Sequence, residues 1–181
     1  MARSRASTRH SRFCRRRSSV APEVFDRLVA LLTETKAKFR VIEHAAEGKS
    51  EAISIIRGNR PDQAAKAMVL DVRGGGGGRR HVLAILPGSR KLDFAAVAAL
   101  FEARKCGFAS PETAQELTGC VMGAVPPFAL NPELAIVVEQ DLLANESLFF
   151  NAGRLDRSME LDTRDWLAVA KPRVAKIASL A

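Results

Sequence analysis

Two apolar segments separated by five glycines constrain the fold of this chain more than any other feature. Residues 64–72, AAKAMVLDV, are apolar at nearly every position, which is typical of a strand buried on both faces. Residues 81–87, HVLAILP, have the same character and follow as a return strand. The glycines at 74–78 suit a flexible turn, so the sequence predicts an extended hairpin with a largely buried body.

The other segments alternate between helical and extended patterns. Helices are expected over residues 22–38, 50–57 and 93–103, from Ser110 to Gly119, and from Asp162 or Thr163 onward. Strands are expected at residues 40–45, 106–110, 134–140, 147–153 and 158–162. Because strands and helices are interleaved irregularly, with several hairpins, the predicted fold class is α/β in the sense of a mixed α+β domain.

The net charge of +8 is concentrated at one end of the chain. Residues 1–20 hold seven arginines and no acidic residue, which leaves 21 basic and 20 acidic residues elsewhere. We expect residues 1–20 to form a disordered tail and residues 21–181 a single domain. The tail is open to three interpretations: an unstructured leader, an arm that seeks RNA, or an organelle transit peptide.

The sequence lacks the residues that several functional classes require. The three histidines are isolated and no CxxC pair or G-x-S-x-G motif occurs, so we expect no metal, no cofactor and no Ser or Cys triad. The five glycines lack the spacing of a phosphate-binding loop. No apolar run approaches the roughly 20 residues of a membrane span. Three widely spaced cysteines favour a reducing cytoplasm.

Lys66 stands near the start of the first apolar strand, on the same pleat face as Met68 and Leu70. An unpaired ammonium among such neighbours is costly, so the amine must reach the rim, a counter-charge or a ligand. One interpretation is that it reaches solvent at the strand's beginning. The other is that it lies at the mouth of a pocket and holds a phosphate or a carboxylate.

The segment VMGAVPPF, residues 121–128, is a stiff loop where an apolar strand would otherwise follow. Gly123 can adopt a positive φ, whereas Pro126 and the proline after it fix their own φ and exclude central strand pairing. The N–H groups of Gly123, Ala124 and Val125 then have no obvious ladder partner. Rigid N–H groups of this kind suit a carbonyl or an oxyanion. A tight turn into a strand is the alternative.

A third segment, FFNAGRLDRSMEL at residues 149–161, combines a strand end with several charges. Asn151 ends the strand, and Gly153 permits close backbone approach. Arg154 and Arg157 stand on either side of an aspartate. The functional interpretation is a pocket wall with basic residues that RNA phosphates can reach. The alternative is a hairpin turn with solvated charges.

These three segments occur in order and together resemble the YbaK/ProX family of aminoacyl-tRNA deacylases, which is similar to the editing domain inserted in bacterial prolyl-tRNA synthetases. The resemblance covers about residues 24–172 and leaves the basic tail outside. It implies a barrel-like mixed β-sheet with packed helices. Lys66 matches the family's strand-heading lysine, residues 123–127 match its Gly/Pro loop, and Gly153 matches its glycine after the late strand.

The resemblance also implies a reaction. Family members hydrolyse the ester that joins a wrong amino acid to the 3′ end of a tRNA. Lys66 would hold the phosphate of the terminal adenosine or nearby groups, the amides of Gly123 and Ala124 would polarise the ester carbonyl, and a water would attack with help from a tRNA hydroxyl. The other expected contacts are Cys120, Met122, Val125, Pro126, Asn151 and Gly153 to the substrate, and Arg154 and Arg157 to the tRNA.

The resemblance is to the free-standing branch directed at serine and threonine, so Ser-tRNA and Thr-tRNA are the expected substrates. The alternatives are Ala- or Cys-tRNA(Pro), and a non-catalytic binding module of the same fold. A general RNA-binding protein is disfavoured by the 6% aromatic content. The near-neutral charge outside the tail predicts weak affinity for tRNA, or delivery by a partner synthetase. We expect a monomer or a weak homodimer.

Overall fold

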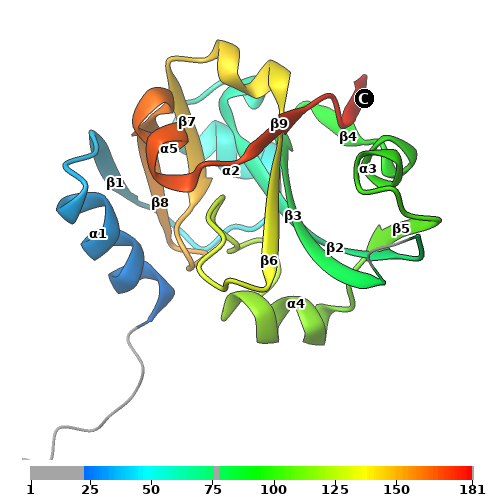
Figure 1. Ribbon diagram of the computed structural model, residues 1–181. Helices are drawn as coiled ribbons and strands as arrows, with labels where there is room; N and C mark the ends of the chain where they lie inside the picture. Colours follow the sequence, from blue (N-terminus) through cyan, green and yellow to red (C-terminus); the bar gives the residue numbers. More distant parts are fainter. Residues whose placement is uncertain (1–22, 76–77, 181) are drawn as a thin grey trace, which may run out of the picture.

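The computed structural model describes residues 23–75 and 78–180, and it confirms the mixed α+β class. Within these residues the chain forms three sheets and five α-helices (Figure 1). The expected disordered tail, residues 1–20, lies outside the described residues. Among the described residues, we find no helix that combines the length and the apolar character needed to cross a membrane.

The largest sheet has the strand order β5-β2-β3-β6-β9. Its strands are β5 (Lys105–Phe108), β2 (Ala65–Arg73), β3 (Arg79–Pro87), β6 (Leu134–Glu139) and β9 (Arg173–Ala175). The predicted hairpin is confirmed, because β2 and β3 pair antiparallel along their whole length, from Ala65 opposite Pro87 to Arg73 opposite Arg79. β6 then adds parallel to β3, and β9 adds parallel to β6.

Two smaller sheets complete the strand structure. One has the order β1-β8-β7, with β1 (Phe39–Glu43), β8 (Arg157–Asp162) and β7 (Ser147–Asn151). The other pairs β4 (Arg90–Leu92) with β10 (Ala178–Leu180). A single parallel bridge joins Ala64, just before β2, to Phe149 of β7. The ladders of the described residues do not close into one barrel, so the barrel-like detail is not confirmed.

The helices begin and end largely where the sequence places their caps. They are α1 (Val24–Glu34), α2 (Ser50–Arg57), α3 (Phe94–Leu100), α4 (Pro111–Thr118) and α5 (Thr163–Ala170), with 3-10 turns at Pro61–Gln63 and Gln140–Ala144. Asp93, Ser110 and Asp162 accept hydrogen bonds from the first turns of α3, α4 and α5. Gly58 and Gly119 end α2 and α4 in the left-handed conformation, as predicted.

The main errors of the prediction concern helix ends and short strands. α1 stops at Glu34 rather than at residue 38, and Lys36 then adopts a φ of 55°. α3 stops at Leu100 rather than at residue 103, and Glu102 adopts a φ of 52°. The three-residue strands β4, β9 and β10 were not predicted, because so few residues carry no periodic signal.

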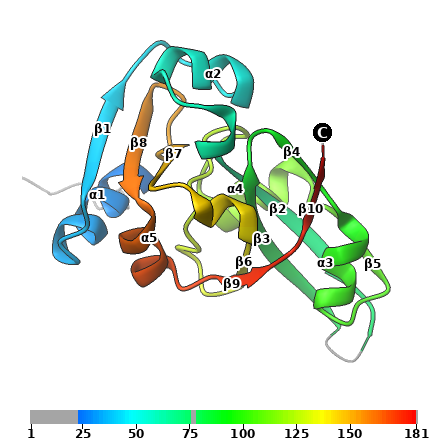
Figure 2. The ribbon, with the colours of Figure 1, turned by 90° about the horizontal axis from the view of Figure 1, so that it is seen from above.

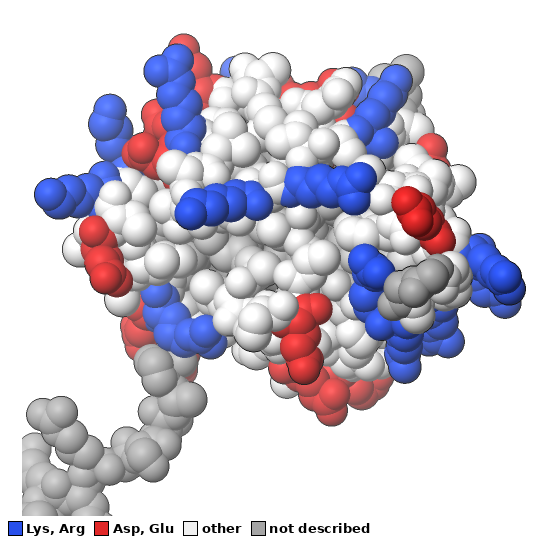
Figure 3. All heavy atoms as spheres, in the orientation of Figure 1, with Lys and Arg blue, Asp and Glu red and all other residues white. Residues whose placement is uncertain are grey.

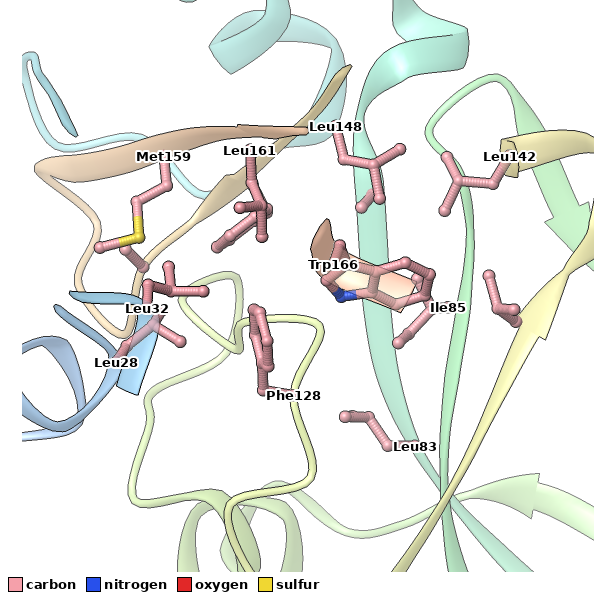
Figure 4. Close-up of a cluster of buried hydrophobic side chains, with 14 of the residues drawn as sticks. Leu28, Leu32, Leu83, Ile85, Phe128, Leu142, Leu148, Met159, Leu161 and Trp166 are labelled. Atoms are coloured by element: carbon pink, nitrogen blue, oxygen red, sulfur yellow. The ribbon is translucent and has the colours of Figure 1, made fainter. Parts of the chain in front are cut away.

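The main core lies between the large sheet and the β1-β8-β7 sheet, and Trp166 of α5 stands near its middle (Figure 4). Residues from seven helices and strands contribute to it, together with residues between them; among these are Leu28, Leu32, Leu83, Ile85, Phe128, Leu148, Met159 and Leu161. The indole Nε1–H of Trp166 donates to the carbonyl oxygen of Pro127 at 2.9 Å. This bond ties the proline loop to the buried core.

Candidate functional site

A cavity of about 190 Å³ opens where α2, β2, β7 and the glycine–proline loop meet. Figure 2 shows α2 above the space between the two larger sheets. The cavity is lined by Gly48, Ser50, Ile53, Arg57, Ala64, Ala65, Lys66, Ala67, Met68, Met122, Gly123, Val125, Phe149, Phe150 and Asn151. The three segments that the sequence singled out therefore meet at one site, together with α2, which was not assigned a functional role.

Lys66 lies in the cavity wall, near the start of β2, as predicted. Its side chain is half-buried, and Nζ donates to the carbonyl oxygen of Arg90 at 2.8 Å. Burial lowers the pKa of the Lys66 amine, and the charge of Glu51 works against that shift. The amine thus has one neutral partner and is close to the open space of the cavity.

The loop reaches the cavity through Gly123, whose φ is 85°. A Cβ at this position would lie 2.8 Å from Cα of Gly48 and 2.9 Å from its carbonyl oxygen. Only a glycine permits both the left-handed backbone and this close approach. Gly48 belongs to the segment before α2, so the glycine pair joins the loop to α2.

The N–H groups of the loop are not equivalent. The structure shows no acceptor among residues 23–75 and 78–180 for the N–H of Gly123 or of Val125, and both residues line the cavity. The expectation for Ala124 is wrong, because its N–H donates to the carbonyl oxygen of Val121 at 3.0 Å and the residue is fully buried. The available donors are therefore Gly123 and Val125.

Asn151 fixes the loop from the β7 side. Its Nδ2 donates to the carbonyl oxygens of Glu47 at 2.9 Å and of Gly123 at 2.8 Å. Its Oδ1 accepts from the hydroxyl of Ser158 at 2.9 Å, and that hydroxyl lies 2.7 Å from Nε2 of His44. Sequence reasoning treated His44 as isolated, since its partners are far away in the chain.

Pro126 and Gly153 were expected to contact the substrate, but they do not line the cavity. Both instead support the loop through backbone hydrogen bonds. Pro126 is buried, and its carbonyl oxygen accepts from the N–H of Phe128 at 2.8 Å. Gly153 donates its N–H to the carbonyl oxygen of Ala124 at 2.9 Å. A Cβ on Gly153 would lie 2.8 Å from Cγ1 of Val24, so this glycine permits α1 to pack closely.

Arg154 and Arg157 do not line the cavity either, and neither has the free charge that the sequence suggested. Arg154 pairs with Glu23 at 3.2 Å and with Asp156 at 2.9 Å. Arg157 pairs with Glu43 at 3.2 Å. The guanidinium of Arg154 holds the pKa of Asp156 at about 2. Figure 3 shows basic and acidic side chains distributed together over the visible face.

A second hollow of about 470 Å³ adjoins the first and shares with it Ala67, Met68, Met122, Gly123 and Val125. Its other lining residues are mostly apolar and include Phe108, Ala109 and Cys120. Cys120 is buried, and burial raises the pKa of its thiol to about 11. The predicted contact residues Cys120, Met122 and Val125 thus all line this second hollow.

Residues 44–169 match the sequence profile of the aminoacyl-tRNA editing domain. The chain belongs to the aminoacyl-tRNA editing domain family. Among curated proteins, the Multifunctional Ser/Thr-tRNA deacylase ProXp-y of Escherichia coli (strain K12) is 44% identical over 149 residues, which are 82% of this chain and 89% of that protein. The same protein from Escherichia coli O157:H7 matches equally well.

Solved structures share the fold of this editing domain. A hypothetical protein superimposes with a TM-score of 0.75 at 20% identity, over 84% of this chain and 99% of that one. A proposed trans-editing enzyme for prolyl tRNA synthetase superimposes with a TM-score of 0.73 at 24% identity, over 89% of this chain and 99% of that one. At these identities the likeness supports the fold alone.

The editing domain has further cavity residues that the sequence reasoning missed. Ser50, Ile53 and Arg57 line the cavity from α2. Their spacing of three and four residues places them on one helical face, which is a signal that the sequence already contained. Gly48 was missed because its role depends on contact with Gly123, 75 positions later, and a single sequence does not reveal such a contact.

Proposed function

We propose that this protein is a trans-editing deacylase, which hydrolyses the ester bond of tRNA wrongly charged with serine or threonine. The observation that carries the proposal is the meeting of Lys66, Gly123 and Asn151 at one cavity in a chain 44% identical to a Ser/Thr-tRNA deacylase. The acceptor end of the aminoacyl-tRNA is the substrate. A partner synthetase that delivers the tRNA is consistent with the near-neutral charge outside the tail.

The cavity offers hydrogen-bond donors where charge develops during ester hydrolysis. When water attacks the ester carbonyl, negative charge grows on its oxygen. The free N–H groups of Gly123 and Val125 stabilise that oxygen, and in enzymes one such donor contributes roughly 3 kcal/mol. Ala124 contributes by shaping the turn, since its own N–H is already bonded to Val121.

The remaining roles follow from position. Lys66 binds the phosphate of the terminal adenosine or a nearby group of the acceptor end. Asn151 holds Gly123 in place, whereas Pro126 and Gly153 support the loop from behind. Cys120, Met122 and Val125 contact the aminoacyl end of the substrate from the adjoining hollow. An aminoacyl ester is already activated, so positioning a water next to it, with help from a tRNA hydroxyl, is sufficient for a modest catalyst.

The test is a panel of labelled tRNAs that carry Ser, Thr, Ala, Cys or Pro, incubated with the wild type and with Lys66→Ala. We expect release of Ser and Thr by the wild type and a loss of at least a hundredfold in the variant. Arg40→Ala is the matched control, because this exposed residue pairs with Glu160 and does not line the cavity. Release of only Ala or Cys would show that the proposed substrate is wrong, while the deacylase activity would stand. No release by folded wild type would indicate a binding module.

A further inference from the structure

Arg57 is the last residue of α2 and lies half-buried in the cavity wall. It is held by two neutral acceptors: Nε donates to Oδ1 of Asn59 at 3.0 Å, and one terminal nitrogen donates to the hydroxyl of Ser158 at 3.3 Å. A guanidinium has five N–H groups. Three of them therefore have no acceptor among the residues that the structure describes.

The charge of Arg57 is also unbalanced. Burial lowers its pKa to about 10, so the side chain is still a cation at neutral pH. No aspartate or glutamate lines the cavity among the described residues. A half-buried cation without a counter-charge is costly unless an anion completes the site.

Arg57 differs from the arginines of the described chain that form ion pairs, and it is less exposed than those that form none. Carboxylates within 4.0 Å accompany Arg40, Arg60, Arg73, Arg79, Arg90, Arg154 and Arg157. Neither Arg57 nor Lys66 takes part in any of the ion pairs found in residues 23–75 and 78–180. The cavity thus brings together two cations that have no ion-pair partner among the described residues.

We propose that Arg57 is a second phosphate-binding residue beside Lys66, and that the two cations together form a phosphate subsite, which binds a phosphodiester of the acceptor end of the substrate tRNA. The assignment to tRNA rests on the proposed function, whereas the phosphate chemistry rests on the cavity alone. The planar guanidinium presents parallel N–H groups that match two phosphate oxygens, and Lys66 adds a point charge. Asn59 and Ser158 hold the guanidinium of Arg57 in place before the ligand binds.

Phosphate binding can be measured without any catalysis. Inorganic phosphate and AMP are titrated into the wild type, Arg57→Gln, Arg57→Lys and the control Arg40→Gln, and the shift in melting temperature gives the affinity. We expect Arg57→Gln to lower the affinity for both ligands about tenfold or more, since it loses charge-assisted hydrogen bonds. Arg57→Lys keeps the charge, so its affinity for both ligands should lie between those of the wild type and Arg57→Gln. Equal affinity in the wild type and Arg57→Gln, with both folded, would overturn the subsite.

Kinetics with seryl-tRNA test the assignment to tRNA. We expect Arg57→Gln to raise KM about tenfold, with kcat within twofold, and to reduce the slope of log KM against log salt by about 0.7, the value for one contact to a single-stranded phosphate. Phosphate that binds through Arg57 but does not compete with seryl-tRNA would overturn the assignment to tRNA. If wild type binds phosphate through Arg57 but hydrolyses no ester, the proposed function fails while the subsite stands.

Discussion

The side-chain amide of Asn151 is bonded to the main chain of Gly123, with a distance of 2.8 Å between Nδ2 and the carbonyl oxygen. The same nitrogen donates to Glu47 at 2.9 Å, so both amide hydrogens are used. One side chain therefore holds both backbone segments at the glycine contact. The orientation of the free Gly123 N–H depends on this arrangement.

Replacement of Asn151 by alanine removes both bonds and leaves the hydroxyl of Ser158 without its acceptor. We expect kcat for deacylation to fall by at least tenfold and the free energy of unfolding to fall by about 1–3 kcal/mol. Single-turnover kinetics and urea unfolding measure the two effects. Asn131→Ala is the control, because this side chain accepts only a local bond from the N–H of Glu133. Unchanged kcat in Asn151→Ala would remove the residue from the site.

Gly123→Ala combines backbone strain with a clash against Gly48. Gly78→Ala is a matched control, because Gly78 also has a positive φ, 69°, but an added Cβ there meets nothing within 4 Å. We expect both variants to lose about 1–2 kcal/mol of stability from the left-handed backbone, and Gly123→Ala to lose more because of the clash. Only Gly123→Ala should lose deacylation, by at least a hundredfold. Equal activity of the two variants would show that the glycine contact is not needed for catalysis.

The β2–β3 hairpin predicts a pH dependence of stability. Asp71 is 7% exposed and bonds to both Arg73 and Arg79, which hold the pKa of its carboxyl well below the ordinary value of 3.8. This stabilisation is fully present above the unfolded pKa and is lost as pH falls through that value toward the folded pKa.

We therefore expect Asp71→Asn to lower the free energy of unfolding by about 1–3 kcal/mol at pH 7. The difference from the wild type should shrink as the pH falls below 3.8. Urea unfolding at several pH values measures both effects. Asp62→Asn removes a more exposed carboxylate, 49% exposed, and should change stability by less than about 1 kcal/mol. A pH-independent difference for Asp71→Asn would contradict the linkage.

Arg154→Gln and Arg157→Gln test whether these two arginines bind tRNA. Their charges are already balanced by Glu23, Asp156 and Glu43, so a phosphate would have to displace a carboxylate. We expect each change to alter KM for seryl-tRNA by less than twofold. A rise of fivefold or more in either variant would restore these residues to the tRNA interface.

Local sequence signals were sufficient for most of the fold. Asp93, Ser110 and Asp162 cap helices, and Gly58 and Gly119 end them, because these effects depend only on neighbouring residues. The β2–β3 hairpin was predictable for the same reason. The parallel pairing of β3 with β6 was not, since it depends on contacts between residues far apart in sequence.

In the candidate site too, features set by neighbouring residues were predictable and those set by distant contacts were not. Lys66, Gly123 and Asn151 stood out because each breaks a local pattern, and all three line one cavity. The hydrogen bond from Ala124 to Val121 was missed, since a free N–H cannot be read from a sequence that lacks turn geometry. The ion pair of Arg154 with Glu23 spans 131 positions, so the loss of its free charge could not be foreseen.

The bond from Asn151 to Glu47 also determines when the site can form during synthesis of the chain. These residues are 104 positions apart, and the ribosome adds about 5–20 residues per second, so roughly 5–20 seconds separate their appearance. Until Asn151 is added, the nascent chain lacks the amide that holds the Glu47 and Gly123 segments together. The candidate site is thus complete only after almost the whole domain has been made.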